Sequence, residues 1–444
     1  MNLKQLKIGD SAKVIEVEGK DKERQHLLDM GLIPGTTVKA VKQAPLGDPL
    51  EIELHGYELA IRNSHAEKVS VEKILTAKGA QADIFDFCKE CSSCDHKCKY
   101  FNQDELINET EHPGLGESGK FHNKKHEKPL PKDKTITFAL AGNQNSGKTS
   151  LFNAMTGSSQ HVGNFPGVTI DRTDGVIKGY DNTRITDLPG VYSLSPYSKE
   201  EMITREFILN DDVDCIINII DATSIERSLY LTMQLLQLEH PMVVALNMMD
   251  EVAKNDGSIL VNKLERSLGV PIVPISAIKN EGIDELINHA MHIAKYQELP
   301  LQQDFCAADD RGGSVHRALH SIMHMIEDHC KRDEEHPHKH IIPVRFAAEK
   351  IAEGDKSVID AIKPNKQDLE AIEHILKHME EECDMDRSAL IADMRYRYIM
   401  KVCKRCVIKG KPSVQRKRSE VADKLLTGKW TGIPSFIVIM GLIF

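Results

Sequence analysis

Residues 1–75 alternate apolar and polar positions in four short segments. This alternation is typical of β-strands that bury one face. A short helix fits residues 21–29, and glycine and proline at residues 31–35 mark the turn that follows it. Closely spaced short strands predict a small β-barrel over residues 1–75. The expected strands are residues 12–17, 37–41, 50–54 and 58–62.

Residues 135–297 show a second pattern, in which short apolar runs alternate with segments of helical period. The apolar runs predict strands at residues 136–140, 184–186, 215–220, 243–246 and 272–275. Helical spacing predicts helices at residues 148–155, 225–238, 259–268 and 283–294. Strands that alternate with helices predict an α/β domain with a doubly wound, mostly parallel sheet.

The remaining parts of the chain lack strand alternation. Residues 298–410 place apolar side chains at helical spacing, for example Leu369, Ile372 and Leu376, and predict an α-helical bundle. Residues 76–134 bear cysteines and histidines and become rich in glycine, proline and lysine, which predicts a flexible linker. The chain is therefore expected to hold three folded domains of unequal size.

The composition fits a globular chain, since 41% of the 444 residues are hydrophobic and 28% are charged. This balance excludes a mostly disordered protein. A net charge of −10 argues against a nucleic-acid-binding surface over the whole chain, so no nucleic-acid partner is expected. The first residues contain no apolar run of the kind that a secretory signal needs, so we expect the ten cysteines to be reduced.

Charge is distributed unevenly along the sequence. Residues 401–429 hold ten basic and two acidic side chains, a net charge of +8, so the other 415 residues carry −18. Trp430 and the apolar residues 431–444 follow this basic stretch. The apolar run is shorter than the ~20 residues of a membrane-spanning helix, but positive charge typically flanks such helices on the cytoplasmic side. Taken alone, the run fits a buried helix or an interfacial segment, but its basic flank favours a membrane helix.

Residues 142–149 carry the strongest functional signal, a G-x-x-x-x-G-K-[ST] motif between a predicted strand and a predicted helix. Glycines in such a loop let backbone N–H groups face phosphates, and the helix N-terminus adds partial positive charge. Lys148 is expected to reach the β- and γ-phosphates, and Thr149 to hold Mg²⁺. The predicted nucleotide-binding residues here are Gly142, Asn143, Gln144, Asn145, Ser146, Gly147, Lys148, Thr149 and Ser150.

Four further motifs follow in the order that a GTPase requires. Thr169 stands where a mobile switch would sense the γ-phosphate and Mg²⁺, and Asp187 ends a predicted strand, where a carboxylate would act near Mg²⁺. The Asp250 carboxylate can accept hydrogen bonds from guanine N1–H and N2–H₂, a donor pair that adenine lacks. These motifs add to the predicted nucleotide site Gly167, Val168, Thr169, Asp187, Leu188, Pro189, Gly190, Asn247, Met248, Asp250, Ser276 and Ala277.

With all five motifs in register, residues 135–410 resemble the cytosolic part of the FeoB family of bacterial ferrous iron transporters. The resemblance rests on residues 142–153, 162–169, 187–193, 221–234 and 246–250. Residues 1–75 resemble FeoA, an SH3-like barrel, through residues 28–35 and 45–49. The chain is thus similar to the cytosolic portion of a fused FeoA–FeoB protein at the cytoplasmic membrane of a bacterium. The resemblance implies that residues 411–444 are a basic juxtamembrane segment and the truncated start of the first transmembrane helix. Gln144 replaces the proline that is more usual in this loop of the family, a change we expect to be tolerated.

The resemblance implies a slow, K⁺-stimulated GTPase that regulates or drives Fe²⁺ uptake. Val191 stands where many signalling GTPases carry a glutamine that orients water, and valine has no polar atom for that task. In the family, the residue at the position of Asn145 helps to bind K⁺ beside the phosphates. Catalysis is then expected from Lys148, Asn145, Thr169 and Gly190, with Mg²⁺ held by Thr149, Thr169 and Asp187.

The resemblance also implies partners. These are GTP and GDP, Fe²⁺ as the transported substrate, the transmembrane portion of FeoB, a contact between the FeoA-like and GTPase domains, and a homo-oligomer. A helical regulatory domain is implied for residues 298–410. GTP-dependent ordering of residues 160–171 would bias this domain and, through it, the membrane part.

A run of four cysteines lies in the predicted linker: Cys88, Cys91, Cys94 and Cys98 have the spacing C-x₂-C-x₂-C-x₃-C. The same spacing occurs in bacterial iron–sulfur ferredoxins, although there proline follows the fourth cysteine and here Lys99 follows. Thiolates at this density suit Zn²⁺ or an Fe–S cluster, and we favour neither metal over the other. The alternative interpretation is a set of reduced thiols without metal.

Two sets of histidines offer further candidate Fe²⁺ contacts. His316, His320 and His324 recur every four residues along a predicted helix, and a second set, His336, His338 and His340, alternates in a predicted loop. Histidines in such positions more often lie on a solvated face, and we favour that interpretation. Cys403 and Cys406 form a C-x-x-C pair that by itself indicates no function.

Two other classes of protein compete with this interpretation. A soluble K⁺-dependent GTPase of RNA modification or ribosome assembly carries the same five motifs. A GTPase of that class predicts neither the FeoA-like unit, nor the net negative charge of the residues outside 401–429, nor the apolar C-terminal run. As a binding module, the barrel of residues 1–75 would contact a regulator or the GTPase domain, since it resembles the SH3-like domain of metal-dependent repressors. No DNA-recognition helix is visible there.

Overall fold

The computed structural model describes residues 1–19, 21–44, 47–74, 129–131, 133–157, 160–165, 168–195, 197–210, 213–306, 310–332 and 342–410, with residues 434, 435, 437 and 441. Two compact units divide the chain. Described residues of Met1–Gly19, Leu32–Glu111 and Gly410–Phe444 belong to the first, and those of Lys20–Gly31 and His112–Lys409 belong to the second. Within these described ranges, no helix is both long and apolar enough to cross a membrane.

The first unit is a five-stranded antiparallel sheet with the strand order β4-β3-β2-β1-β5. Its strands alternate buried and exposed residues, as the sequence pattern predicts, and Val14, Val38 and Ile52 are fully buried. The last strand returns to pair with the first, which suits a small SH3-like barrel and confirms the predicted fold class. The elements are η1 (Leu3–Gln5), β1 (Ser11–Val17), β2 (Thr37–Gln43), β3 (Leu50–Leu54), β4 (Tyr57–Ile61), α2 (Asn63–Ala66) and β5 (Val69–Lys73).

The second unit contains a seven-stranded sheet with the order β13-β11-β10-β6-β9-β8-β7. Five neighbouring strands, from β13 to β9, are parallel, which confirms the predicted α/β domain with a mostly parallel sheet. The strands are β6 (Ile136–Gly142), β7 (Gln160–Asn164), β8 (Asp171–Gly175), β9 (Thr183–Asp187), β10 (Cys215–Asp221), β11 (Met242–Asn247) and β13 (Ile272–Pro274).

The edge strands β7 and β8 are antiparallel and are not predicted by the sequence pattern. Their sequences, QHVGN and DRTDG, lack the apolar alternation of a half-buried strand. Val162 is 76% exposed, so this edge is held by backbone pairing rather than by a buried face.

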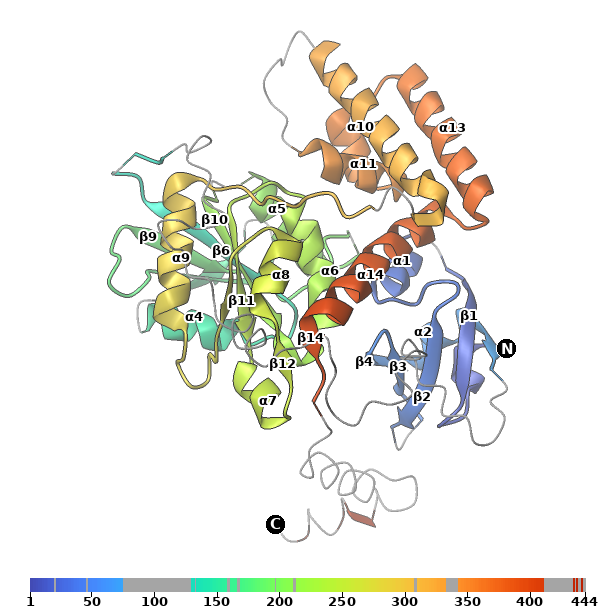
Figure 1. Ribbon diagram of the computed structural model, residues 1–444, viewed down its shortest axis with the longest axis horizontal. Coiled ribbons are helices and arrows are strands. Elements are labelled where there is room, and N and C mark those ends of the chain that lie inside the picture. Colours follow the sequence, from blue (N-terminus) through green and yellow to red (C-terminus); the bar gives the residue numbers. More distant parts are fainter. Residues whose placement is uncertain are drawn as a thin grey trace, which may run out of the picture. The chain divides into compact units, whose positions relative to one another are not determined.

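Helices α4 (Lys148–Thr156) and α9 (Ile283–Tyr296) contact each other and cover one face of this sheet (Figure 1). The core on that face includes Leu140 of β6 and Ile217 of β10. Neighbouring strand residues point to opposite faces. Asn218 therefore faces the other side, where Thr232 of α6 (Ile225–Leu236) donates a 2.7 Å hydrogen bond to it. The same unit contains α5 (Lys199–Asn210), η3 (Ala222–Ser224), α7 (Met249–Lys254), β12 (Ser258–Ile259) and α8 (Val261–Leu268).

The C-terminal part of the second unit is helical, as predicted. Helix α10 packs against α11 and α13, and α14 packs along α6 and α8 of the α/β part. After α14 the short strand β14 (Val407–Ile408) pairs with β12, so the helical part returns to the α/β part. The helical elements are η4 (Asp310–Gly313), α10 (Ser314–Arg332), α11 (Val344–Ala352), α12 (Lys356–Ile362), α13 (Lys366–Cys383) and α14 (Arg387–Cys406).

Helix α1 (Asp21–Asp29) begins and ends as the sequence predicts, yet it belongs to the second unit. Arg24 forms a two-pronged ion pair with Asp386, at 2.9 and 2.5 Å. The ring of His26 stacks on Tyr197 at 4.0 Å, and the Tyr396 hydroxyl donates to the backbone oxygen of Asp29 over 2.8 Å. Polar and aromatic contacts thus hold this helix against α14 and the loop after β9.

Several predictions lie outside the described residues. These are the cysteine run Cys88, Cys91, Cys94 and Cys98, the histidines His336, His338 and His340, the switch residue Gly167 and the basic segment with its apolar run. The domain boundaries expected from the sequence, at residues 75, 134, 297 and 410, remain predictions.

Candidate nucleotide-binding site

The loop of residues 142–149 connects β6 to α4 at the carboxyl edge of the parallel strands. Asn145 and Gly147 both adopt positive φ angles, 63° and 93°. The Ser146 hydroxyl donates to the backbone oxygen of Asn143 over 2.8 Å, which fixes the turn. Backbone N–H groups at the N-terminus of α4 are then free of helical partners and suit an anion such as a phosphate.

Gly147 packs directly against the side chain of Asn247. A Cβ atom on this residue would lie 2.3 Å from Asn247 Nδ2, so only glycine fits. Asn247 Nδ2 donates to the backbone oxygen of Ser146 over 2.8 Å, and its Oδ1 accepts from the backbone N–H of Ala277 over 2.9 Å. One buried amide therefore joins the phosphate loop to the loop that would cover a base.

Asp250 lies at the start of α7, next to that second loop. The Ser276 hydroxyl donates to Asp250 Oδ1 over 3.1 Å, and Lys279 Nζ lies 3.5 Å from Oδ2. Burial opposes ionisation, but the hydrogen bond from Ser276 and the charges of Lys279 and Lys254 hold the pKa of Asp250 below its ordinary value. The carboxylate is thus an oriented, charged acceptor, as recognition of a base with two N–H donors requires.

Lys148 and Asp187 share a buried environment at the phosphate end of the site. Burial lowers the pKa of Lys148, although Asp187 opposes this effect. Burial also raises the pKa of Asp187 to about 6, although Lys148 opposes it. Asp187 Oδ1 is buried and accepts no hydrogen bond from the described residues. An orphaned carboxylate oxygen suits a hard cation such as Mg²⁺, so the residues present fit that ion.

Gly190 brings the motif of residues 187–190 against the phosphate loop. A Cβ atom on Gly190 would lie 2.8 Å from Lys148 Nζ and 3.1 Å from the Cα of Gln144. The next residue, Val191, is 2% exposed, and its backbone N–H donates to the oxygen of Gly142 over 3.3 Å. The valine side chain is packed in the core, so it offers no group to orient a water molecule.

The predicted switch residue Thr169 is exposed. Phe165 anchors the segment before it, because its ring is 3% exposed and meets the Phe207 ring edge-on at 6.0 Å. The Arg172 guanidinium lies over both rings, 5.7 Å and 5.1 Å from their centres. Thr169 therefore stands between a buried anchor and β8, where a change in its position needs little repacking.

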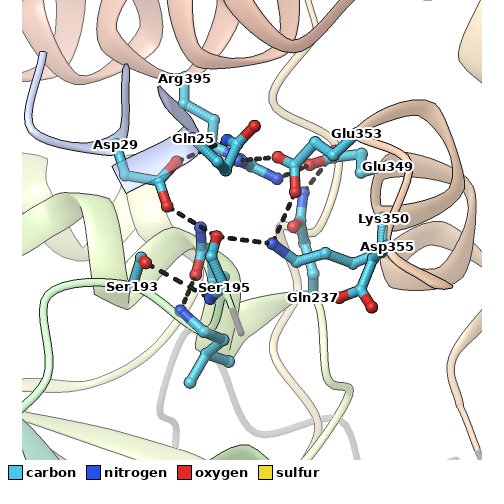
Figure 2. Close-up of polar contacts among 12 residues, drawn as sticks. Gln25, Asp29, Ser193, Ser195, Gln237, Glu349, Lys350, Glu353, Asp355 and Arg395 are labelled. Atoms are coloured by element: carbon cyan, nitrogen blue, oxygen red, sulfur yellow. Dashed lines mark hydrogen bonds and ion pairs between the residues drawn. The ribbon is translucent and has the colours of Figure 1, made fainter. Parts of the chain in front are cut away.

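A buried polar network begins shortly after Gly190 and includes the end of α1 (Figure 2). The Ser195 hydroxyl donates to Asp29 Oδ2 over 2.6 Å, and the Tyr230 hydroxyl donates to Asp29 Oδ1 over 2.7 Å. Lys350 Nζ of α11 lies 3.3 Å from the Ser195 hydroxyl oxygen. Asp29 is 4% exposed and Ser195 is 2% exposed. These side chains thus connect α1, the loop after β9 and the helical part.

Arg395 of α14 forms the other half of this network (Figure 2). Its guanidinium is fully buried, donates to the Tyr230 hydroxyl over 3.2 Å, and pairs with Glu353 at 2.5 Å and Glu349 at 2.8 Å. Lys350 pairs with Glu353 at 2.7 Å. Sequence reasoning missed this network, because its members are spread from residue 29 to residue 395 and match no spacing rule.

The structure brings most of the predicted site residues together in the described part of the chain. The phosphate loop, Asp187, Gly190, Asn247, Asp250, Ser276 and Ala277 surround one edge of the sheet. Thr149 and Ser150 lie exposed in the first turn of α4.

For two histidines the predicted solvated face is wrong. His316 and His320 are half-buried and lie against Asp304 and Cys306. His324 is 74% exposed, as predicted. Cys403 and Cys406 are buried in α14.

Family models match three successive parts of the chain. The FeoA domain matches residues 1–73, ferrous iron transport protein B matches residues 136–290, and the FeoB cytosolic helical domain matches residues 312–408.

Curated relatives match the same parts. An Fe(2+) transport protein A/Fe(2+) transporter FeoB fusion protein of Porphyromonas gingivalis is 30% identical over 454 residues, which cover 100% of this chain and 51% of that protein. The Fe(2+) transporter FeoB of Escherichia coli is 34% identical over 319 residues, 70% of this chain and 38% of that protein. The chain thus spans about half the length of the first relative and less of the second.

Solved structures of a FeoB cytosolic domain also resemble the chain. NFeoB from S. thermophilus bound to GDP·AlF4⁻ and K⁺ is 38% identical with a TM-score of 0.52, covering 61% of this chain and 99% of that one. A GDP-bound variant of the S. thermophilus FeoB G-domain is 37% identical with a TM-score of 0.55 and the same coverage. Since that domain is covered almost completely and the three family models follow in order, the chain belongs to the FeoB family of ferrous iron transport proteins, with a FeoA domain fused ahead of the FeoB cytosolic portion.

Proposed function

We propose that the chain binds GTP with Mg²⁺ and hydrolyses it to GDP and phosphate. The observation that carries this proposal is the Asn247 amide, which ties Ser146 of the phosphate loop to Ala277 of the base loop. The two ends of a nucleotide would then be held at one fixed separation. Asp250 beside Ser276 supplies the acceptor that distinguishes guanine from adenine.

Substitution of the base-recognising carboxylate tests guanine recognition. We expect Asp250→Asn to lose most GTP affinity, because an amide presents only one acceptor to two guanine donors. The same variant should gain affinity for xanthosine triphosphate, in which a carbonyl replaces the guanine amino group and can accept from the new amide. Titration of both nucleotides on both proteins reports the exchange. Equal loss for both nucleotides would contradict base recognition by Asp250.

In the proposed reaction the chain's own groups bind and orient the phosphates. Lys148 and the backbone N–H groups of the phosphate loop face the transferred phosphoryl group, and Gly190 offers its N–H from the opposite side. Thr149, Thr169 and Asp187 would hold Mg²⁺, which supplies charge neutralisation when bound. Val191 is packed away, so no side-chain base is assigned. Such a site depends on charge placement alone, which suits a slow enzyme.

We propose further that K⁺ assists this reaction through Asn145. Asn145 lies in the phosphate loop with a positive φ of 63°, and it is exposed. Its side-chain amide oxygen is therefore available to a monovalent cation. Asn145→Gly tests this assignment, since glycine tolerates the positive φ and removes the whole side-chain amide together with its oxygen. We expect the ratio of turnover in KCl to turnover in NaCl to fall toward one in this variant. Equal wild-type rates in the two salts would contradict the K⁺ assignment.

At the scale of the longer protein, we propose that this GTPase regulates or drives Fe²⁺ uptake across the cytoplasmic membrane of a bacterium. The chain would then act on the cytoplasmic side, next to the transmembrane portion of FeoB. A soluble GTPase of RNA modification is disfavoured, because it accounts for neither the FeoA match nor the cytosolic helical match. Uptake of radioactive iron by cells that carry the Asp250→Asn protein in its full-length form tests the role in transport.

We also propose that α1 is the point at which the FeoA-like residues act on the GTPase. The support is the hydrogen bond from Ser195, which follows the γ-phosphate-sensing motif, to Asp29. Asp29→Asn should alter the rate of GDP release measured with a fluorescent analogue, whereas Lys22→Ala on the exposed side of α1 should not. Identical release rates for wild-type and Asp29→Asn protein would contradict the coupling.

A further inference from the structure

Four side chains of different metal-ligating types converge outside the nucleotide site. Asp304 and Cys306 lie in the segment between α9 and η4, and His316 and His320 lie on the first turns of α10. Each offers one ligand atom, and the four atoms lie within 4.8 Å of one another. No other group of three or more such side chains occurs among the residues that the structure describes.

The backbone explains why these four side chains meet. Residues i and i+4 of a helix share a face, which places His316 above His320 with ring centres 4.2 Å apart. Asp304 and Cys306 flank Phe305, whose ring is buried and packs on Tyr398 of α14 at 5.0 Å. Phe305 thus fixes the segment to the helical part and leaves the residue on each side to face α10.

The measured distances within the cluster are slightly shorter than the distances between the ligands of a tetrahedral ion. Cys306 Sγ lies 3.1 Å from His316 Nδ1 and 2.9 Å from Asp304 Oδ1, and His320 Nε2 lies 3.2 Å from Asp304 Oδ2. Bonds of about 2.0–2.3 Å to a tetrahedral ion separate its ligands by roughly 3.3–3.8 Å. Side-chain shifts of less than an ångström would therefore admit an ion among these atoms.

Arg345 of α11 supports the cluster from its buried side. Its guanidinium lies 2.5 Å from Asp304 Oδ1 and 3.1 Å from Cys306 Sγ, and its side chain is 6% exposed. Groups that hydrogen-bond to a metal ligand and hold it in place raise the affinity for the metal. The thiolate and the carboxylate together carry two negative charges, and the two imidazoles are neutral. A bound divalent ion therefore leaves the site with no net charge. Arg345 keeps Glu349, 3.8 Å away, as its own counter-charge.

We propose that Asp304, Cys306, His316 and His320 form a binding site for a divalent transition-metal ion of the Zn²⁺ type. Thiolate and imidazole ligands favour such borderline ions over Mg²⁺. The ion fastens the segment after α9 to α10, and so fixes where the helical part leaves the α/β part. Because the site uses no nucleotide ligand, its test is independent of the proposed GTPase activity.

The test is a Co²⁺ titration of the full, nucleotide-free chain in which Cys88, Cys91, Cys94 and Cys98 are all replaced by serine. This background removes the other cysteine cluster. We expect one Co²⁺ per chain, with the visible d–d bands of tetrahedral geometry and a thiolate-to-cobalt charge-transfer band. Zn²⁺ should displace the cobalt, and Mg²⁺ should not.

Variants in the same background assign the ligands. Cys306→Ser should abolish the charge-transfer band, and His316→Ala and His320→Ala should each weaken binding at least tenfold, since even loss of an outer-shell partner costs about 10–100-fold. His324→Ala and Cys330→Ser, on the same helix outside the cluster, should change neither measurement. Circular dichroism checks that each variant is folded. A charge-transfer band that survives Cys306→Ser, or a background chain that binds no stoichiometric Co²⁺, would overturn the proposal.

A second measurement does not rely on cobalt spectra. Zn²⁺ should raise the unfolding temperature of the background chain and should have no such effect on Cys306→Ser. Equal stabilisation of both proteins by Zn²⁺ would also overturn the assignment.

Discussion

Gly147 must be glycine for two separate reasons. Its φ of 93° is strained for any residue with a Cβ, and that Cβ would meet Asn247. The first reason concerns the local backbone, and the second concerns the link between the phosphate loop and the base loop. The two contributions can be separated, because Gly179 has a similar φ of 79° with open space around it.

Gly147→Ala should therefore weaken binding of a fluorescent GDP analogue by more than about tenfold, or ~1.4 kcal/mol. Gly179→Ala should carry only the backbone strain of about 1–2 kcal/mol, visible as reduced stability with unchanged nucleotide affinity. Similar affinities for the two variants would show that the Asn247 contact does not position the phosphate loop.

Glu201 of α5 is a buried carboxyl group, only 3% exposed, and it makes the stability of the chain depend on pH. Burial raises the pKa of its carboxyl to about 7, against hydrogen bonds from Ser198 and with a further rise from the charge of Asp29. The folded chain therefore keeps this proton up to near-neutral pH, whereas the unfolded chain loses it near the ordinary value of 4.5. The contribution of Glu201 to the free energy of unfolding is therefore fully present below about pH 4.5, and it is lost as the pH rises toward 7.

We expect Glu201→Gln to remove that loss, since glutamine can still accept the Ser198 backbone hydrogen bond of 3.0 Å. The unfolding free energy of the variant, relative to wild type, should rise by roughly 2 kcal/mol between pH 5 and pH 8. Urea unfolding at several pH values measures this difference. A difference that stays constant with pH would show that Glu201 is ionised in the folded chain.

At the scale of elements, α14 connects most of the second unit. Asp386 caps its N-terminus by accepting from the Ala389 backbone N–H over 3.1 Å, and it also pairs with Arg24 of α1. A cap and an ion pair thus rest on one carboxylate. The Asp386 side chain is 38% exposed, so its ion pair is expected to contribute less than the cap.

Two substitutions separate these contributions. Asp386→Ala removes both and should cost about 1–2 kcal/mol in unfolding free energy. Asp386→Asn keeps a good cap and loses only the charge, so it should cost less than ~1 kcal/mol. Denaturant unfolding followed by circular dichroism compares them. Equal losses would mean that the pair with α1, not the cap, is what Asp386 contributes.

The elements also show what a sequence pattern can and cannot reveal. Four of the five parallel strands carry buried apolar runs, so periodicity predicts them, whereas β9 has the sequence TRITD with one apolar residue. The motif residues follow at the ends of the strands. Strands β7 and β8 are missed because pairing, not burial, makes them strands. The environment of His316 is missed because its partners, Asp304 and Cys306, lie on a segment without regular structure. The sequence pattern places Asp29 at the end of an ordinary surface helix, and only tertiary packing buries it.

At the scale of the whole molecule, the buried network makes the second unit depend on residues from the first matched domain. Without Asp29, the Tyr230 and Ser195 hydroxyls lose a buried acceptor. Loss of one partner from a buried polar network costs about 1–3 kcal/mol. The solved S. thermophilus domain matches 61% of this chain, so a fragment without the first matched domain is a suitable protein for testing this dependence.

We therefore expect residues 129–410 alone to have a lower free energy of unfolding than the same residues in the full chain, by about 1–3 kcal/mol. Asp29→Asn in the full chain should reproduce a large part of this loss, and Lys22→Ala should not. Calorimetry of the fragment, the full chain and the two variants makes the comparison. A fragment as stable as the full chain would show that α1 adds no stability to the second unit.

The return of β14 to β12 has a mechanical consequence. The helical part leaves the α/β part after α9 and pairs with it again through two residue pairs, Ser258 with Ile408 and Ile259 with Val407. Between these two attachments α14 also packs along α6 and α8. The helical part therefore cannot slide away from the α/β part without opening the β12–β14 pair and the packing of α14 together.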